Sequence, residues 1–351
     1  MILSAVEKMF SCLTMGKKAQ EETPFMKNGR MLLEELIASC NGKCNHIRTF
    51  SSQELNRATN NYHHEQMIFR DSGYTVYKGF LEDRRPITIK RYSSFWENTD
   101  YREFRYLLES AMTDIVIGTQ MSVHKNVLKL IGCCLDFEFP ILVYEFVGNC
   151  TLSNRIGKYC SKPLSWKCRI RIAADIAYAV AYLHTALSRL VVLRDIRPST
   201  VILDQDNVAK LTDFSLSVSI PDGESHVITG VFAKTGYLPL EYLNSGYVTE
   251  KLDVFYFGLL LLHLLTGNST FFKVNDLDYV SPYEHLKQCV ENQELIKIVD
   301  PDILKDVEQQ QIVDVGTLAL SCICNEAEGR PTMTDITKQL WRIHRSLCTM
   351  L

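Results

Sequence analysis

The sequence lacks an apolar run long enough to cross a lipid bilayer. Its most apolar stretch, Val254 to Leu265, is about a dozen residues long and contains His263, whereas a membrane-spanning helix needs about 20 residues. A buried core helix is therefore predicted there. The first residues, Met1 to Leu13, also lack the pattern of a signal peptide, because Glu7 and Lys8 interrupt their apolar positions. Disulfide bonds are consequently not expected.

Paired metal-binding cysteine motifs are also missing, although the chain has 12 cysteines. The tightest pairs, Cys133-Cys134 and Cys322/Cys324, do not form CxxC halves of a zinc site. We expect reduced, mostly buried thiols. An excess of one charge sign is absent too, since the formal net charge is -3, and this gives no electrostatic reason to expect nucleic acid as a partner.

Enough sequence is present for a large buried core. The chain has 351 residues, of which 46% are hydrophobic, and this suits a globular domain with some added sequence at its N-terminus. Near the start, Ile2, Val6, Met9 and Leu13 recur at helical spacing, so a short amphipathic helix and disorder are both open. No glycine follows the first methionine for myristoylation, so we expect only weak or indirect membrane contact.

A second helix is predicted before residue 41. Leu32, Leu33, Leu36 and Ile37 share one helical face, and Asn41-Gly42 is a typical helix stop. This apolar stripe needs a partner. It either packs on the rest of the domain or docks another protein.

Two acidic residues lie in neighbouring short motifs. Asp195 belongs to L-R-D-I-R-P-S-T, which begins at Leu193, and Asp213 begins D-F-S. The apolar runs Val201 to Leu203 and Ala209 to Leu211 lie between them and predict a β-hairpin. We expect this ribbon to carry the two carboxylates at its opposite ends and to bring them into one cleft.

These motifs resemble the catalytic loop H-R-D-x-K-P-x-N and the metal-binding D-F-G of protein kinases. In that family the first Asp accepts the proton of the substrate hydroxyl, and the second Asp holds magnesium. Four positions depart from the pattern. Leu193 replaces His, Arg197 replaces Lys, Thr200 replaces the metal-binding Asn, and Ser215 replaces the last Gly.

The glycine-rich loop of that family is degraded in this chain. Alignment on Val76-Tyr77-Lys78-Gly79 puts Phe69, Asp71 and Tyr74 where the three glycines belong, while Gly73 lies at an intermediate position. Glycines let backbone amides approach the phosphates of ATP. We therefore expect a β-hairpin turn here that is a poor phosphate cradle.

Ile87-Thr88-Ile89-Lys90 resembles the V-A-I-K strand of kinases. The resemblance implies that Lys90 binds the α- and β-phosphates and pairs with an acid on the following helix; a solvated strand lysine is the alternative. Asp114 is the predicted acid, with Glu109 and Glu103 as alternatives.

Two strands are expected to end at the hinge between the two lobes of such a kinase. They are Leu128 to Cys134 and Ile141 to Phe146. The resemblance implies that Tyr144, Glu145 and Phe146 line the adenine pocket.

Further positions of the resemblance concern the scaffold. A helix is predicted from Trp166 to Leu183. Glu241 is expected to form a buried ion pair with Arg330, and Asp253 to brace the backbone of the catalytic loop.

Before the kinase-like region, the chain contains a phrase typical of plant receptor-like kinases, F-S-x-x-E-L-x-x-A-T-N-N-F. It begins at Phe50 and ends with Tyr62 in place of the last Phe. Ser51 and Glu54 have the spacing of a capping box, which predicts a helix that runs through Tyr62.

The resemblance to protein kinases thus covers about residues 50 to 345. The sequence is similar to the plant ZED-related branch of receptor-like cytoplasmic kinases, which is allied to wall-associated kinases. The implied fold class is α+β, a bilobal protein-kinase fold with a small β-rich N-lobe and a large helical C-lobe. The expected divisions are an N-terminal extension (1–49), the N-lobe with its preceding helix (50–147), the C-lobe (148–345) and a tail (346–351).

The resemblance implies a pseudokinase that acts as an adaptor in plant innate immunity. Such an adaptor bridges a coiled-coil NLR immune receptor, bound through its leucine-rich repeats, and effector-modified receptor-like cytoplasmic kinases. It is expected in the cytoplasm, with recruitment to the plasma membrane. The alternative is a weakly active serine/threonine kinase in defence signalling.

Binding of ATP and magnesium is expected to be weak or absent, because Thr200 offers only a neutral hydroxyl and the loop glycines are gone. If the protein is active, Asp195 is the proton acceptor and works with Lys90 and Arg197, while Asp213 holds the metal. Lys90, Asp114, Tyr144, Glu145, Phe146 and Asp213 are the nucleotide-binding candidates.

Two surfaces are candidates for partner binding. The stripe around Leu36 is expected to dock on leucine-rich repeats. The segment from Ser215 to Lys234 contains the apolar residues Val227, Ile228, Val231 and Phe232 among turn-forming residues. We expect this segment to be poorly ordered in the free protein and to become ordered on a second kinase. The alternative is that Val231 and Phe232 fold back onto the large lobe.

Overall fold

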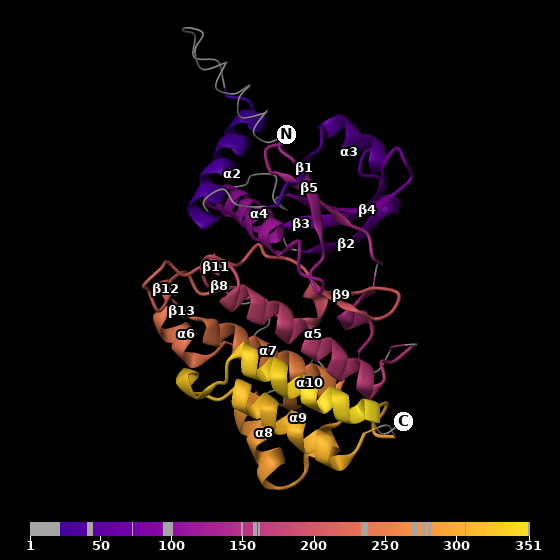
Figure 1. Cartoon of the computed structure of the whole chain (residues 1–351), viewed down its shortest axis with the longest axis vertical. Helices are drawn as coiled ribbons and strands as arrows, with labels where there is room; N and C mark the ends of the chain where they lie inside the picture. Colours follow the sequence, from indigo (N-terminus) through magenta and orange to yellow (C-terminus); the bar gives the residue numbers. More distant parts are fainter. Residues whose placement is uncertain are drawn as a thin grey trace. The chain divides into compact units, whose positions relative to one another are not determined.

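The computed structural model describes residues 22–40, 45–71, 73–93, 101–148, 150–156, 160, 162–232, 238–267, 273–275, 278–279, 282–305 and 307–349. The chain divides into two compact units (Figure 1). The N-terminal unit comprises Met1–Val123 and Lys129–Phe146, and the C-terminal unit comprises His124–Leu128 and Val147–Leu351. The helix predicted within the first fifteen residues lies outside the described residues.

The N-terminal unit is built on one six-stranded sheet with the order β1-β5-β6-β4-β3-β2. The strands are β1 (Arg48–Thr49), β2 (Met67–Asp71), β3 (Tyr74–Phe80), β4 (Pro86–Tyr92), β5 (Leu130–Cys134) and β6 (Ile141–Glu145). The helices are α2 (Pro24–Cys40), α3 (Ser52–Ala58), the short 3-10 helix η1 (His64–Gln66) and α4 (Tyr101–Met121). The predicted β-rich lobe, its hairpin and its two hinge strands are confirmed.

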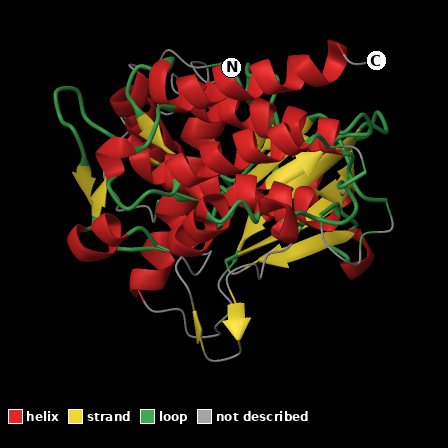
Figure 2. Cartoon of the chain, turned by 90° about the horizontal axis from the view of Figure 1, so that it is seen from below, coloured by secondary structure: helices red, strands yellow, loops and turns green. Residues whose placement is uncertain are grey.

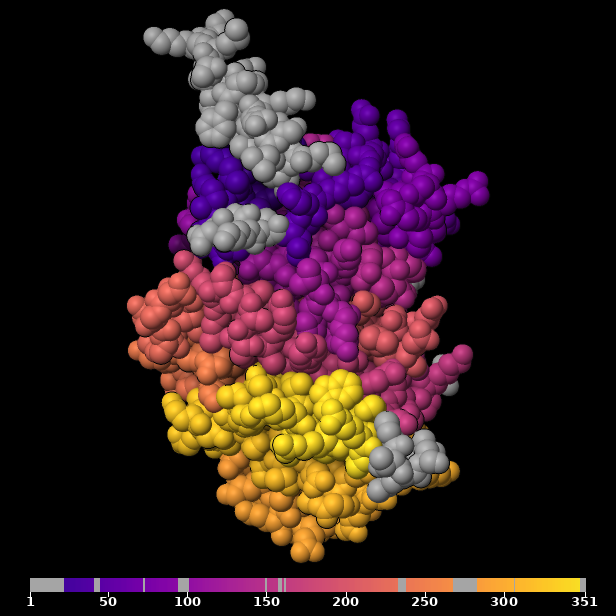
Figure 3. All heavy atoms as spheres, viewed as in Figure 1, coloured from indigo at the N-terminus to yellow at the C-terminus, as the bar shows by residue number. Residues whose placement is uncertain are grey.

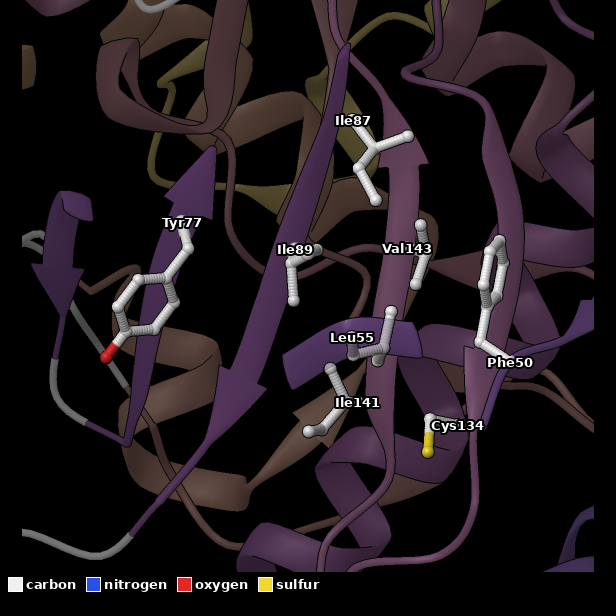
Figure 4. Packing of buried hydrophobic residues seen from close by; sticks show 8 residues of the cluster. All are labelled: Phe50, Leu55, Tyr77, Ile87, Ile89, Cys134, Ile141 and Val143. Atoms are coloured by element: carbon white, nitrogen blue, oxygen red, sulfur yellow. The ribbon is translucent and has the colours of Figure 1, made fainter. Parts of the chain in front are cut away.

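Helix α3 is held on this sheet by apolar residues from the phrase that precedes the kinase-like region. Leu55 of α3 and Phe50 before it are buried with Tyr77, Ile87, Ile89, Cys134, Ile141 and Val143 (Figure 4). The predicted capping box is present, because the hydroxyl of Ser51 accepts a hydrogen bond from the amide of Glu54, whose carboxylate accepts one from the amide of Ser51. Helix α3 ends at Ala58, however, and does not reach Tyr62.

The early end of α3 has a backbone cause. Asn60, Asn61 and Tyr62 have φ angles of 49°, 56° and 56°. These left-handed values are incompatible with a continuing right-handed helix. The phrase therefore forms a short helix followed by a turn.

Helix α2 is present as predicted, but its apolar stripe is mostly core. It packs against α4, and Leu36 is only 5% exposed, whereas Ile37 is 53% exposed. Leu32 is buried and Leu33 is half-buried. The prediction that Leu32 and Leu36 dock a partner is therefore wrong, because both side chains already pack inside the N-terminal unit.

A polar contact also fixes α2 to this unit. The side-chain amide of Asn28 donates hydrogen bonds to the carbonyls of Leu135, at 3.1 Å, and Phe137, at 2.9 Å. Both carbonyls lie in the loop between β5 and β6. Since Asn28 is buried, these bonds satisfy an amide that would otherwise be costly to remove from water.

Helices are the main element of the ribbon in Figure 2, and the C-terminal unit is mainly helical, as predicted. Its helices are α5 (Trp166–Thr185), α6 (Leu240–Ser245), α7 (Glu250–Thr266), α8 (Pro282–Glu291), α9 (Gln309–Cys322) and α10 (Met333–Thr349). Its 3-10 helices are η2 (Leu152–Asn154), η3 (Pro198–Thr200), η4 (Leu295–Ile298) and η5 (Ala327–Gly329). Helix α7 packs against both α5 and α9, and nearly all of its residues are buried. The buried core helix predicted at Val254 to Leu265 is confirmed.

Short strands complete this unit. They are β7 (Cys150–Thr151), β8 (Val191–Val192), β9 (Val201–Leu203), β10 (Ala209–Leu211), β11 (Val218–Ser219), β12 (Val227–Ile228), β13 (Tyr247–Val248), β14 (Lys273–Asn275) and β15 (Asp278–Tyr279). Among the described residues of the whole chain, no helix has the length and apolar character needed to span a membrane.

Replacing Leu36 with alanine should lower the free energy of unfolding by about 2–5 kcal/mol, because a buried leucine leaves a cavity when it is truncated. Replacing its neighbour Ile37 with alanine is the matched control and should change stability by no more than about 0.5 kcal/mol. Urea denaturation of both variants measures the difference. Equal, small effects would show that α2 does not belong to the core of the unit.

Candidate functional site

The loop between β8 and β9 carries Asp195, and Arg197 binds its carboxylate. The Arg197 Nε atom lies 2.8 Å from Asp195 Oδ1 and 3.1 Å from Oδ2, and Nη1 donates to the hydroxyl of Ser199 at 2.8 Å. Asp195 is 3% exposed. Arg197 stands where the family has lysine, and its guanidinium is directed onto the neighbouring carboxylate.

A second buried carboxylate holds the backbone of this loop. Asp253 accepts hydrogen bonds from the amides of Leu193 and Arg194, both at 2.8 Å, and lies 2.8 Å from Nε2 of His184. Arg194 has a φ of 68°, a conformation that is costly for a non-glycine residue. The two hydrogen bonds to Asp253 hold the backbone in this conformation. The predicted bracing role of Asp253 is confirmed.

The predicted ion pair between Glu241 and Arg330 is also present. Its atoms Oε1 and Nη1 are 2.6 Å apart, and the Arg330 side chain is fully buried. Arg330 additionally donates to the carbonyls of Cys324 and Lys251, at 3.0 and 3.1 Å. This arginine therefore ties α6 and the start of α7 to the loop before α10.

The hairpin β9–β10 forms as predicted, but its two acids flank the same end of the ribbon. Val201 pairs with Leu211, and the amide of Thr212 donates to the carbonyl of Thr200 at 2.9 Å. The outer ends of an antiparallel pair necessarily lie together. The expectation that Asp195 and Asp213 lie at opposite ends of the ribbon is thus wrong.

Asp213 and Thr200, the residues expected at the metal position, are both engaged locally. The hydroxyl of Ser215, which replaces a glycine, donates to Asp213 Oδ1 at 2.6 Å. The hydroxyl of Thr200 donates to the carbonyl of Arg197 at 3.0 Å and accepts from its amide at 3.2 Å. A hydroxyl so engaged is a poor replacement for an amide oxygen that binds magnesium.

In the N-terminal unit, the predicted pairing of Lys90 with Asp114 is confirmed. Lys90 Nζ lies 2.7 Å from Asp114 Oδ2, and the two side chains are 6% and 0% exposed. Glu109, one of the alternatives, instead binds Arg105 on the surface of α4 at 2.6 Å.

Two tyrosines surround this ion pair. Lys90 Nζ is 4.0 Å from the ring centroid of Tyr74 and 4.9 Å from that of Tyr92, and the Tyr92 hydroxyl donates to Asp114 Oδ2 at 2.9 Å. From the sequence, Tyr74 is predicted only as the replacement of a glycine, and Tyr92 is not predicted at all. The spacing could have indicated Tyr92, because it is two residues after Lys90 on one strand and must lie on the same face of the sheet.

The residues expected to line the adenine pocket lie at the end of β6. Tyr144 is buried. The carboxylate of Glu145 accepts a hydrogen bond from the amide of Lys129 at 3.1 Å, and Lys78 Nζ lies 4.6 Å from the ring centroid of Phe146. Their role in binding a nucleotide stays a prediction.

The segment predicted to be loosely ordered, Ser215 to Lys234, forms short strands in its described part, which ends at Phe232; residues 233–234 lie outside the described residues. Val218 pairs with Val192 of β8, and Ile228 pairs with Tyr247 of β13. These two short ladders fix the segment on its own unit, because pairing satisfies backbone groups of both partners.

The end of this segment is attached to one buried phenol. The Tyr242 hydroxyl accepts from the amide of Phe232 at 3.0 Å and from Arg194 at 3.2 Å, and it donates to the carbonyl of Gly230 at 3.0 Å. The Phe232 ring lies 5.5 Å from the Arg194 guanidinium. Phe232 thus folds back in part, as the alternative proposed, but remains 43% exposed.

Neither unit, taken by itself, presents its retained kinase residues in a form that fits a nucleotide triphosphate with magnesium. Each charged residue kept from the kinase pattern contacts a residue that replaces one of the family's. Asp195 binds Arg197, and Asp213 binds Ser215. Lys90 lies over the ring of Tyr74. Phosphates or a metal ion would have to displace these contacts.

Comparison with known proteins identifies the relatives of this chain. Residues 62–342 match the protein kinase domain. The chain is 36% identical over 344 residues to the serine/threonine-protein kinase ZRK1 of Arabidopsis thaliana, covering 95% of this chain and 96% of that protein. It is 38% identical over 330 residues to the non-functional pseudokinase ZED1 of the same plant, covering 91% and 96%. Wall-associated receptor kinase-like 4 is 34% identical over 323 residues, covering 92% of this chain and 41% of that protein.

Replacing Asp114 with alanine should destabilise the protein by about 3–5 kcal/mol, because the buried Lys90 ammonium loses its countercharge. The double variant Lys90→Met with Asp114→Leu should recover most of this loss, since it leaves neither charge buried. Urea denaturation of Asp114→Ala, of the single variants Lys90→Met and Asp114→Leu, and of the double variant measures the loss and the coupling. A single variant that unfolds at the same urea concentration as the wild type would show that the pair is not buried.

Proposed function

The chain belongs to the ZED-related group of the protein kinase family, and we propose that within it the chain is a catalytically silent adaptor. The observation that carries this proposal is the guanidinium of Arg197 on both carboxylate oxygens of Asp195. A general base must present a lone pair to the proton that it removes. Here the Nε–H group of Arg197 already occupies one acceptor position on each oxygen.

The energetics of phosphoryl transfer also favour a catalytically silent protein. Phosphoryl transfer depends on positioning and charge stabilisation by several parts acting together. If each lost positioning element costs about 2–3 kcal/mol, two such losses slow the reaction roughly a thousandfold or more. The loop glycines and the metal-binding Asn, which Thr200 replaces, are two such elements.

A weakly active serine/threonine kinase is the second candidate. Lys90, Asp195 and Asp213 are retained, and the relative ZRK1 carries the name of a serine/threonine-protein kinase. ZRK2 and ZED1, in contrast, are named non-functional pseudokinases. Activity therefore has to be measured on this chain.

As an adaptor, the protein is proposed to bridge a coiled-coil NLR immune receptor, through its leucine-rich repeats, and other receptor-like cytoplasmic kinases modified by effectors. The proposed setting is the cytoplasm, with recruitment to the plasma membrane during plant innate immunity. The resemblance to ZED-related proteins supports this role. Of the predicted stripe on α2, Ile37 and Leu33 remain accessible to a partner, because Leu32 and Leu36 are buried.

An exposed apolar patch on the C-terminal unit supports the recruitment of a second protein. Ile228 on β12 is 68% exposed, next to its partner Tyr247 on β13. The patch consists of Ile228, Val231, Phe232, Leu240, Leu243 and Tyr247, all exposed. The part of the chain around β12, β13 and α6 lies at the surface on the left of Figure 3. Val227, which is half-buried, contributes less.

The charge beside this patch indicates the kind of partner. A groove of about 640 Å³ adjoins it and shares Tyr247. Its acidic lining residues are Asp222, Glu224, Glu250, Glu326 and Glu328, together with Glu241, which is paired with Arg330. Lys251 also lines the groove, but its amine donates to the carbonyl of Arg330 at 2.6 Å. A partner segment with apolar and basic side chains complements this surface.

Purified protein should transfer no more phosphate from ATP, with either magnesium or manganese, than its Asp195→Asn variant. Radiolabelled ATP and a general protein substrate measure this. Millimolar ATP should also leave the melting temperature unchanged, because ligand that does not bind cannot stabilise the fold. Transfer that needs Asp195, or a magnesium-dependent rise in melting temperature, would favour the weakly active kinase.

Ile228→Asp should abolish co-purification with a cytoplasmic kinase partner, since it places a charge in the apolar patch beside an acidic groove. Ile296→Asp is the matched control, because Ile296 is 50% exposed on η4, outside the patch. Both variants should melt like the wild type and still bind the NLR. Retained kinase binding by Ile228→Asp would exclude this patch as the recruiting surface.

A further inference from the structure

The ammonium group of Lys90 on the sheet lies among the side chains of two tyrosines from neighbouring sheet positions and one aspartate from α4. The register of β3 and β4 pairs Tyr74 with Tyr92 and Val76 with Lys90. Paired and alternate residues of such strands point to the same face, so Tyr74, Lys90 and Tyr92 lie together. Asp114 of α4 reaches them there. We call these four residues the Lys90 clasp.

The clasp covers the ammonium group from several sides. Lys90 Nζ contacts Asp114 Oδ2 at 2.7 Å, and the ring centroids of Tyr74 and Tyr92 lie 4.0 and 4.9 Å away. All four residues are buried. Cation–π attraction and ion pairing are both stronger away from water. The ammonium is therefore held by groups of the protein in the position where a kinase lysine would meet phosphates.

The backbone around Tyr74 keeps its ring in place. Gly73 has a φ of 102°, and a Cβ atom there would lie 3.0 Å from Leu107 Cδ2 of α4. The amide of Ser93 donates to the carbonyl of Gly73 at 3.0 Å. The turn contacts α4 and is hydrogen-bonded to Ser93 after the end of β4. Tyr74 therefore begins its strand at a fixed point beside Lys90.

We propose that the ring of Tyr74 prevents nucleotide phosphates from contacting Lys90. It stands where the glycine-rich loop of this family has its third glycine, so a phenol ring fills space that a hydrogen atom would leave open. A polyphosphate can reach Lys90 only if this ring leaves the clasp. The inference deepens the proposed function, on which it rests, by assigning the exclusion of ATP to one side chain.

An acyl phosphate derivative of ATP tests the clasp. Its carbonyl carbon forms an amide with a lysine amine close to the bound phosphates, the bond to the phosphate oxygen breaks, and ATP and the amine proton are released. Tyr74→Gly should raise the acylation of Lys90, measured by peptide mass spectrometry, by at least about tenfold. Tyr74→Phe, the matched control, keeps the ring and should match the wild type. Excess ATP should suppress the gain.

The inference is overturned if wild-type Lys90 is acylated as fully as in Tyr74→Gly, or if a folded Tyr74→Gly shows no gain. If circular dichroism shows that Tyr74→Gly does not fold, the wild type decides the question. An N-hydroxysuccinimide ester should then acetylate Lys90 at least about tenfold more slowly than the exposed Lys338, with or without ATP. Equal rates would overturn the inference.

The two proposals fail separately. A wild-type protein that is acylated at Lys90 but transfers no phosphate would exclude the clasp and leave the adaptor function standing. Phosphate transfer that depends on Asp195 would exclude the adaptor proposal whatever the reactivity of Lys90.

Discussion

The ion pair of Lys90 and Asp114 shows the constraint on which the rest of the site depends: a charge removed from water needs a partner. Lys90 and Asp195 are nearly inaccessible to solvent. In an enzyme of this family, substrate phosphates and metal ions share in satisfying such groups. Here Asp114, Arg197 and the ring of Tyr74 do so within the protein.

The same constraint explains how the fold is held by contacts that do not depend on catalysis. Asp253 is fully buried and holds two loop amides and His184. Arg169 donates to Asp300 at 2.6 Å and to the carbonyls of Leu164 and Leu264. Removing one member of such a set leaves an unpaired buried charge, which is strongly destabilising. These contacts hold the C-terminal unit together whether or not phosphate is transferred.

The described part of the segment after Asp213, up to Phe232, is held by strand pairing. This changes how a partner would be recognised. The ladders of β11 with β8 and of β12 with β13 present Ile228 and Tyr247 on a preformed surface. Binding to such a surface costs less ordering entropy than folding a disordered loop. The Tyr242 hydroxyl, bonded to Gly230 and Phe232, extends this surface toward α6.

The sequence by itself determined the features that depend on local pattern or short-range chemistry. Strand alternation placed Lys90, the capping box of Ser51 and Glu54 marked the start of α3, and the ordered motifs indicated the two-part kinase fold. Its position in the kinase pattern made Asp114 the predicted partner of Lys90, with Glu109 and Glu103 as alternatives, and the structure selects Asp114.

Only the tertiary structure decided which apolar and polar groups from distant parts of the sequence contact each other. Leu36 and Ile37 are adjacent and equally apolar, yet packing against α4 buries the first and leaves the second in solvent. Tyr92 joined the site because the strand register sets it opposite Tyr74. Periodicity defines the face of an element, but the neighbour that covers this face is set by packing and strand pairing between distant segments.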